Sequence, residues 1–220
     1  MSRLCGNAVL TIIGLDMHYP PIKLRLFWRL WLSVIMIIPF NVSAGFQQAV
    51  EAYELGHYKK ALQHFVPLAQ KGNAKALFNI GFMIEIGKGV PANPPLAIKW
   101  YKRAYKLKHH NAPFNIAFIY YNGSGVNKDY KKALQWYIKA AAVGNSAALI
   151  NIGQMYFFGK GVKKNRVKAY AWYTIAAHRG MRKALRNRDI VARSLTPFDM
   201  NHAEREYRTL RVKYLDPFLK

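Results

Sequence analysis

The sequence predicts an all-α protein, an α/α superhelical solenoid built from antiparallel helix pairs. Three observations support this fold. The segments GKGV, GSGV and GKGV begin at Gly87, Gly123 and Gly159, a constant spacing of 36 residues. The dipeptide Trp-Tyr recurs with the same period, starting at Trp100. Apolar residues between these landmarks fall at helical spacing, so each repeat contains two amphipathic helices that bury their apolar faces by stacking on neighbouring units.

The first predicted element is a signal peptide over residues 1–44. Basic residues precede an apolar run from Leu30 to Phe40, and small residues follow it up to Ala44. This layout is typical of a secretory leader, and a run of eleven residues is shorter than the roughly 20 needed to span a bilayer. We therefore expect cleavage after Ala44. Two alternatives stay open: a shorter leader that starts at Met17, and an uncleaved anchor.

Helix pairs are predicted over the rest of the chain. Residues 45–73 form an N-terminal capping pair whose short turn is Leu55-Gly56-His57-Tyr58, without a GxGV segment. Three repeats follow at 74–108, 110–144 and 146–180, and in each the glycines supply the backbone needed to end one helix and turn toward the next. The second helices are expected to start near Pro94, Asp129 and Asn165. In the second repeat Pro113 must lie in the first helical turn.

Capping helices are predicted at the C-terminus, over residues 181–220. The repeat pattern is lost after Gly180. Thr196 supplies a helix cap, Pro197 a first-turn proline and Asp199 an acidic first-turn residue, so a final helix should run to about Val212. In the central repeat, Trp136 is expected to pack against both neighbouring units, whereas the terminal units should bury less.

The repeated columns resemble the Sel-1-like repeat (SLR), a tetratricopeptide-related family. Its pattern is roughly A-x-x-x-L-G-x-x-Y-x-x-G-x-G-V followed by A-x-x-W-Y-x-x-A-A-x-x-G. The third repeat carries it at Ala148, Gly153, Tyr156, Gly159, Gly161, Val162, Ala169, Trp172, Tyr173, Ala176, Ala177 and Gly180. The resemblance implies an exported bacterial solenoid that acts as a non-catalytic scaffold for protein interactions, with roles in envelope regulation or in host entry and virulence.

Composition restricts the classes of partner. The chain has 34 Lys and Arg against 10 Asp and Glu, a formal charge of +24, and 52% of its residues are hydrophobic. Such a chain can bury a core, which excludes a disordered basic tail, and its surface should attract anionic partners. An exported protein rarely meets a nucleic acid duplex, so we expect no nucleic acid partner. An anionic envelope component is a second partner class beside a protein or peptide, and the chain is expected to be a monomer.

Catalytic chemistry is largely missing from the sequence. The single cysteine, Cys5, lies in the predicted leader, so the mature chain has no thiol. Acidic residues are scattered, the GKGV turns lack the spacing of a phosphate loop, and no HExxH zinc motif occurs. The pair His109-His110 is more typical of solvated polar residues than of a metal site. We expect no catalytic residues, no cofactor and no metal, with a cell-wall-active enzyme as an alternative function.

A partner-binding groove is predicted on the first helices of the pairs, which line the concave face in tetratricopeptide-like folds. The Asn-Ile-Gly column sets which side chains point there. The candidates are Phe78, Asn79, Phe82, Phe114, Asn115, Phe118, Tyr121, Asn151, Gln154 and Phe157. Asparagines offer donors and acceptors to an extended peptide backbone, while aromatic rings take its side chains. Alternatively, the asparagines bond to adjacent helix carbonyls and the C-terminal helix covers the aromatics.

Basic residues are predicted to cluster on the turns and second helices, facing outward. The cluster comprises Lys99, Lys102, Arg103, Lys106, Lys108, Lys128, Lys131, Lys132, Lys139, Lys160, Lys163, Lys164, Arg166 and Lys168. One interpretation is a solvated convex face. The other is a docking surface for anionic lipid headgroups, lipopolysaccharide or an acidic protein, which keeps a polyanion or nucleic acid binder as an alternative function.

Overall fold

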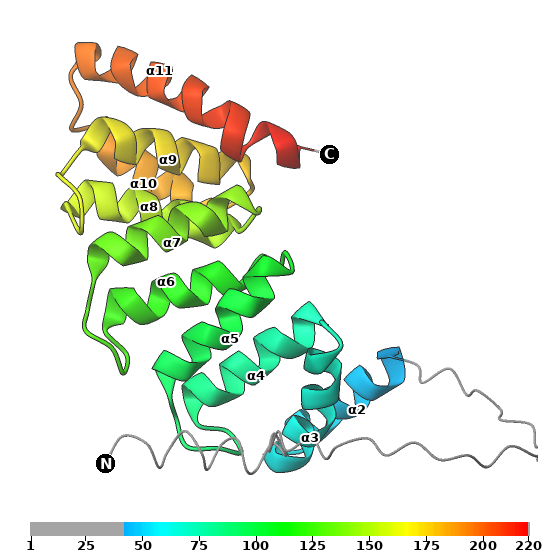
Figure 1. Cartoon of the computed structure of the whole chain (residues 1–220). Helices are drawn as coiled ribbons and strands as arrows, with labels where there is room; N and C mark the ends of the chain where they lie inside the picture. Colours follow the sequence, from blue (N-terminus) through cyan, green and yellow to red (C-terminus); the bar gives the residue numbers. More distant parts are fainter. Residues whose placement is uncertain (1–41, 220) are drawn as a thin grey trace, which may run out of the picture.

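A computed structural model describes residues 42–219 (Figure 1). This part of the chain is helical, without a β-strand. The helices are α2 (Val42–Glu54), α3 (Tyr58–Gln70), α4 (Ala74–Ile86), α5 (Pro94–Lys106), α6 (Ala112–Asn122), α7 (Tyr130–Ala142), α8 (Ser146–Phe158), α9 (Arg166–His178), α10 (Arg182–Ala192), α11 (Pro197–Tyr214) and the 3-10 helix η1 (Asp216–Phe218). The predicted leader, apart from its last three residues, lies outside the described part.

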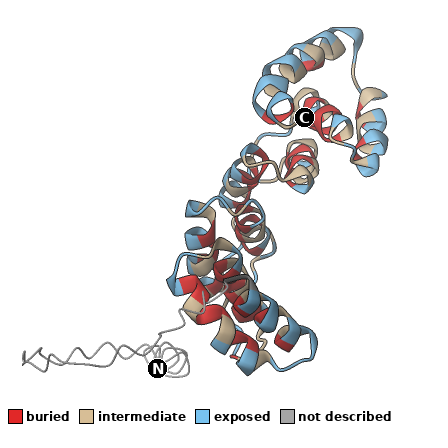
Figure 2. Ribbon diagram, turned by 90° about the vertical axis from the view of Figure 1, so that its right-hand side faces the viewer, coloured by how far each residue is buried: buried red, intermediate tan, exposed pale blue. Residues whose placement is uncertain are grey.

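Consecutive helices pack as pairs that stack along the chain, and the stack is elongated and curved (Figure 2). Each pair α2/α3, α4/α5, α6/α7 and α8/α9 makes its most extensive contacts internally, and α3/α4, α5/α6 and α7/α8 join one pair to the next. Buried residues follow the interior of this stack. The predicted all-α solenoid is therefore confirmed. Over the described residues, no helix combines the length and apolar character needed to cross a membrane.

Local capping chemistry places the helix starts where the sequence predicts them. Asp129 and Asn165 accept hydrogen bonds from the backbone N–H three residues on, at the starts of α7 and α9. Pro94 is the first residue of α5, and Pro113 lies in the first turn of α6, where a missing N–H breaks no helical bond. Thr196 and Asp199 cap α11 reciprocally, and that helix ends at Tyr214, two residues beyond the expected end.

The two glycines of each GxGV turn have separate tasks, seen most clearly in the third turn. Gly159 ends α8 in the left-handed conformation, with φ of 73°. Gly161, with φ of 70°, lies so close to the start of α7 that an added Cβ would come within 2.4 Å of the carbonyl carbon of Tyr130. Gly89 likewise approaches the backbone of Tyr58, the first residue of α3, and Gly125 approaches the ring of Pro94, the first residue of α5. The turn therefore also joins each unit to the preceding one.

The C-terminal helix α11 buries side chains of the third repeat at the end of the stack. α11 packs along α9 and touches α7, and its Tyr214 ring lies 4.8 Å from the Trp172 ring between centroids. Trp172 is only 4% exposed, whereas Trp136 in the central unit is half-buried. Trp136 packs against the core on both sides, as expected. The expectation that terminal units bury less is wrong for the third repeat, because α11 covers it.

Candidate functional site

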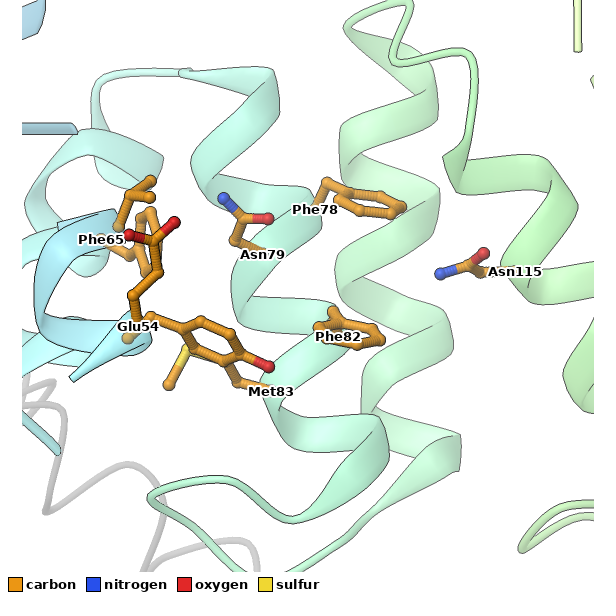
Figure 3. Close-up of a pocket in the computed structure, with 9 residues that line it drawn as sticks. Glu54, Phe65, Phe78, Asn79, Phe82, Met83 and Asn115 are labelled. Carbon is orange, nitrogen blue, oxygen red and sulfur yellow. The ribbon is translucent and has the colours of Figure 1, made fainter. Parts of the chain in front are cut away.

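A hollow of about 460 Å³ opens on the first-helix face, near the N-terminal end of the stack. We call it the N-terminal hollow, and Figure 3 shows it in close-up. It spans α2, α4 and α6, the first helices of three consecutive pairs. Its lining residues are Val50, Tyr53, Glu54, Phe65, Phe78, Asn79, Phe82, Met83 and Asn115. Both its volume and its mostly apolar lining are typical of ligand sites in proteins.

Aromatic rings form the walls of the hollow. Phe82 of α4 and Tyr53 of α2 face each other with ring centroids 6.5 Å apart. Phe78, one helical turn before Phe82, is held against the Tyr101 ring at 5.3 Å and stacks on His109 at 4.3 Å. Phe65 is fully buried and belongs to the core beneath. The rings are thus fixed by packing rather than free to rotate into solvent.

His109, which supports Phe78, is neutral at physiological pH. Burial, the adjacent His110 and the nearby Lys75 lower the pKa of its imidazole to about 4. Its Nδ1 atom is buried without a hydrogen-bond partner among the described residues. A charged imidazolium would be costly here, so the ring acts as an uncharged aromatic support.

A hydrogen-bond chain orders the α6 side of the hollow. The Asn115 side-chain amide donates to the Tyr101 hydroxyl at 3.0 Å, and that hydroxyl donates to a Glu85 carboxylate oxygen at 2.6 Å. Burial raises the pKa of Glu85, and the hydrogen bond from Tyr101 partly opposes that rise. The bond to Tyr101 fixes the orientation of the Asn115 amide.

Six of the ten predicted partner-binding residues line two separate hollows. Phe78, Asn79, Phe82 and Asn115 line the N-terminal hollow. Gln154 and Phe157 line a smaller hollow of about 190 Å³ between α8, α9 and α10. Neither lining includes the remaining four, Phe114, Phe118, Tyr121 and Asn151.

Those four residues differ in how they are held. Phe114 packs edge-on against Tyr137, and the Tyr121 hydroxyl accepts a hydrogen bond from Lys160 at 2.6 Å. Asn151 is half-buried, while Phe118 is 47% exposed. The predicted residues therefore do not line one continuous groove. They lie along the first helices, and two separate hollows open among them.

The first-helix face is left open by the C-terminal helix. α11 packs on α9, a second helix, so it does not cover the aromatics of α4 and α6. Asn115 donates to a tyrosine hydroxyl rather than to a carbonyl of an adjacent helix. The alternative, in which the asparagines bond to adjacent helix carbonyls and the C-terminal helix covers the aromatics, therefore does not hold for the N-terminal hollow.

Comparison with known proteins identifies the repeats. The model of the Sel1 repeat matches residues 74–109, 111–145 and 146–181. A Sel1 repeat protein from Oxalobacter formigenes is 31% identical in sequence, and the match covers 79% of this chain and 74% of that one, with a TM-score of 0.59. The chain belongs to the Sel1 repeat family. Proteins of this family are generally protein-interaction scaffolds without catalytic activity.

Two further solved structures are similar to this chain. A protective antigen present in uropathogenic Escherichia coli strains, described as displaying an SLR fold, is 26% identical with a TM-score of 0.51. That match covers 79% of this chain but 46% of the antigen, so the chain spans less than half of the antigen's length. Cysteine rich protein B of Helicobacter pylori is 22% identical over 67% of this chain and 95% of its own, with a TM-score of 0.43. A search of curated proteins gives no match.

Sequence reasoning missed the α2 and α3 side of the hollow. Val50, Tyr53, Glu54 and Phe65 precede the Sel1 repeats and lack the GxGV turn, so the 36-residue period does not reach them. Alignment on the helix-ending glycine would have found one of them, Glu54. Counted back from Gly56, Glu54 takes the place that the groove candidate Tyr121 has before Gly123.

Basic residues of the Sel1 repeats gather at the GxGV edge and on the second helices. All members of the predicted cluster are exposed except Lys160 and Lys168, which are half-buried. Several ammonium groups lie over aromatic rings, among them Lys139 over Trp136 at 4.2 Å, Lys88 over Tyr58 at 4.7 Å and Lys160 over Tyr121 at 4.8 Å. The rings hold these lysines at the surface without neutralising their charge.

Proposed function

We propose that this chain is a non-catalytic scaffold of the bacterial envelope that binds a peptide or protein partner along its first-helix face. The observation that carries the proposal is the N-terminal hollow, where fixed aromatic rings stand beside two amides and are left open by α11. Monomeric proteins rarely leave such apolar surface bare unless something binds there. Binding would be centred on α4, whose residues Phe78, Asn79 and Phe82 face the hollow (Figure 3).

The first prediction is that Asn79→Ala combined with Phe82→Ala abolishes partner capture. The double variant removes an amide and a ring from the wall of the hollow, and fully desolvated aromatic contacts dominate interface energies. Residues 45–220 would be immobilised, exposed to solubilised envelope proteins, and the bound proteins identified by mass spectrometry. Circular dichroism should show unchanged helix content, because both side chains are only half-buried.

A matched charge variant separates the hollow from the basic edge. Lys131→Glu combined with Lys163→Glu reverses two exposed charges and spares Lys132, which pairs with Asp129 at 3.0 Å. We expect slower association than for the unmodified chain, by an amount that shrinks with added salt, since exposed charges mainly steer encounter. If this variant lost capture at high salt while the hollow variant kept it, the basic edge would be the binding site.

Export is part of the proposal, and the second prediction concerns the leader. The pattern of residues 1–44 supports it, and the E. coli relative, being a protective antigen, is a protein that meets a host. N-terminal sequencing of the chain expressed in a bacterium should give a soluble product that begins at Gly45. Recovery from membranes alone, with Leu30–Phe40 intact, would contradict this part.

A further inference from the structure

Within the described part of the chain, the Glu54 carboxylate in the wall of the N-terminal hollow has no partner. It stands on the last turn of α2, exposed, and it faces α4 across the hollow (Figure 3). No ion pair or hydrogen bond engages its side chain within residues 44–219. In a chain with more than three basic residues for each acidic one, an unpaired carboxylate beside an aromatic wall calls for an explanation.

Almost every other acidic side chain in the described part is engaged. Asp129, Asp189, Glu206 and Asp216 form ion pairs with basic residues. Asp199 belongs to the cap of α11, and Glu85 and Glu204 accept hydrogen bonds from tyrosine hydroxyls. The acids of this part that lack such a partner are Glu51 and Glu54, both on α2, and of these two Glu54 lines the hollow.

The hollow itself carries no positive charge. Its lining contains neither Lys, Arg nor His, and the His109 ring behind Phe78 is neutral because its pKa lies near 4. The lining does contain several acceptors for a cation. These are the Glu54 carboxylate, the amide oxygen of Asn79, and the negative faces of the Tyr53, Phe78 and Phe82 rings.

We propose that the N-terminal hollow binds an arginine side chain of the partner polypeptide, with apolar residues on either side of that arginine. A guanidinium stacks on aromatic faces and presents five donors in a plane, so it can donate to a carboxylate and an amide oxygen at once. A lysine ammonium has three donors and is more strongly hydrated, which fits this lining less well. This inference rests on the proposed function and names the side chain that the hollow selects.

The test uses two blocked tripeptides as probes. Acetyl-Leu-Arg-Leu-amide would be compared with its citrulline analogue, which has nearly the same shape but no charge. Binding to residues 45–220 would be followed by NMR through the side-chain amide signals of Asn79 and Asn115, which lie in the hollow. We expect the arginine peptide to bind about tenfold more tightly, the scale expected of a cation held over aromatic rings.

Two substitutions on α2 make the test specific. Glu54→Gln should weaken binding of the arginine peptide by a few fold, since an exposed ion pair contributes little. Glu51→Gln is the matched control, because Glu51 is also exposed and unpaired on α2 but lies outside the hollow, so it should leave affinity unchanged.

Three results would overturn arginine recognition: equal affinity for the two tripeptides, equal or tighter binding of acetyl-Leu-Glu-Leu-amide, or no shift of the amide signals with the arginine peptide at millimolar concentration. None of these touches the wider proposal, because partner capture by the chain and its loss in the Asn79 and Phe82 variant are measured separately. A hollow that prefers citrulline would still be a binding site, but one that selects apolar segments.

Discussion

Gly161→Ala should destabilise the protein by about 3 kcal/mol or more, although it adds a single methyl group. Two costs combine. An L-residue with φ near 70° is strained by roughly 1–2 kcal/mol, and crowding in a packed site typically costs a further 1–3 kcal/mol. The new Cβ would meet the backbone of Tyr130 and Lys131, which begins α7 and cannot swing aside like a side chain.

Gly180→Ala is the matched control for this prediction. Gly180 has a φ of 78°, and an added Cβ would meet nothing within 4 Å, so this variant should show the backbone cost alone. Urea unfolding followed by circular dichroism would give both free energies of unfolding. If the two variants lost equal stability, Gly161 would be needed only for its backbone conformation, and the contact between units would carry no energy.

Trp172→Ala should cost about 3–5 kcal/mol, the range for a buried large aromatic side chain. Trp172 is 4% exposed and lies against Tyr214 of α11, so its loss would leave a cavity between the last repeat and the C-terminal helix. We also expect α11 to loosen, because this ring is central to its contact with α9.

Trp136→Ala provides the comparison and should cost roughly half as much. Trp136 is half-buried, touches Tyr105 edge-on at 5.9 Å and is flanked by the ammonium groups of Lys102 and Lys139. Part of its surface is already in water, so less apolar area is lost. Thermal unfolding of both variants would check the order. A larger loss for Trp136→Ala would mean that the central interface, rather than α11, dominates stability.

The helix pairs could be predicted from sequence because their determinants are local. Asp129 and Asn165 cap the helices that follow them, and the GxGV glycines end the helices that precede them. Such signals act over a few residues and repeat with the 36-residue period, so the helices assigned in one unit support the same assignment in the next. The same holds for Thr196 and Asp199 at the start of α11.

The binding surface could be predicted only in part, because it depends on packing between distant segments. The period correctly placed Asn79 and Asn115 on one face, but it did not reach Tyr53 and Glu54 in the capping pair. The sequence pattern also did not predict that α11 packs on α9. Capping signals define where a helix starts, but they do not define on which side of the stack it packs. Whether a given ring lies in a hollow is decided by such neighbours.

The contact that Gly161 makes also bears on how such proteins change length. The second glycine of each GxGV turn approaches the second helix of the preceding unit, so this attachment recurs with every 36-residue segment. If residues 146–181 were duplicated, each copy would pack against its neighbours through the surfaces that the single copy already uses. The hollow, formed by α2, α4 and α6 at the opposite end, would be unaffected. The shape of the hollow and the number of repeats can therefore change independently, which suits a family whose E. coli member is more than twice as long as the stretch it shares with this chain.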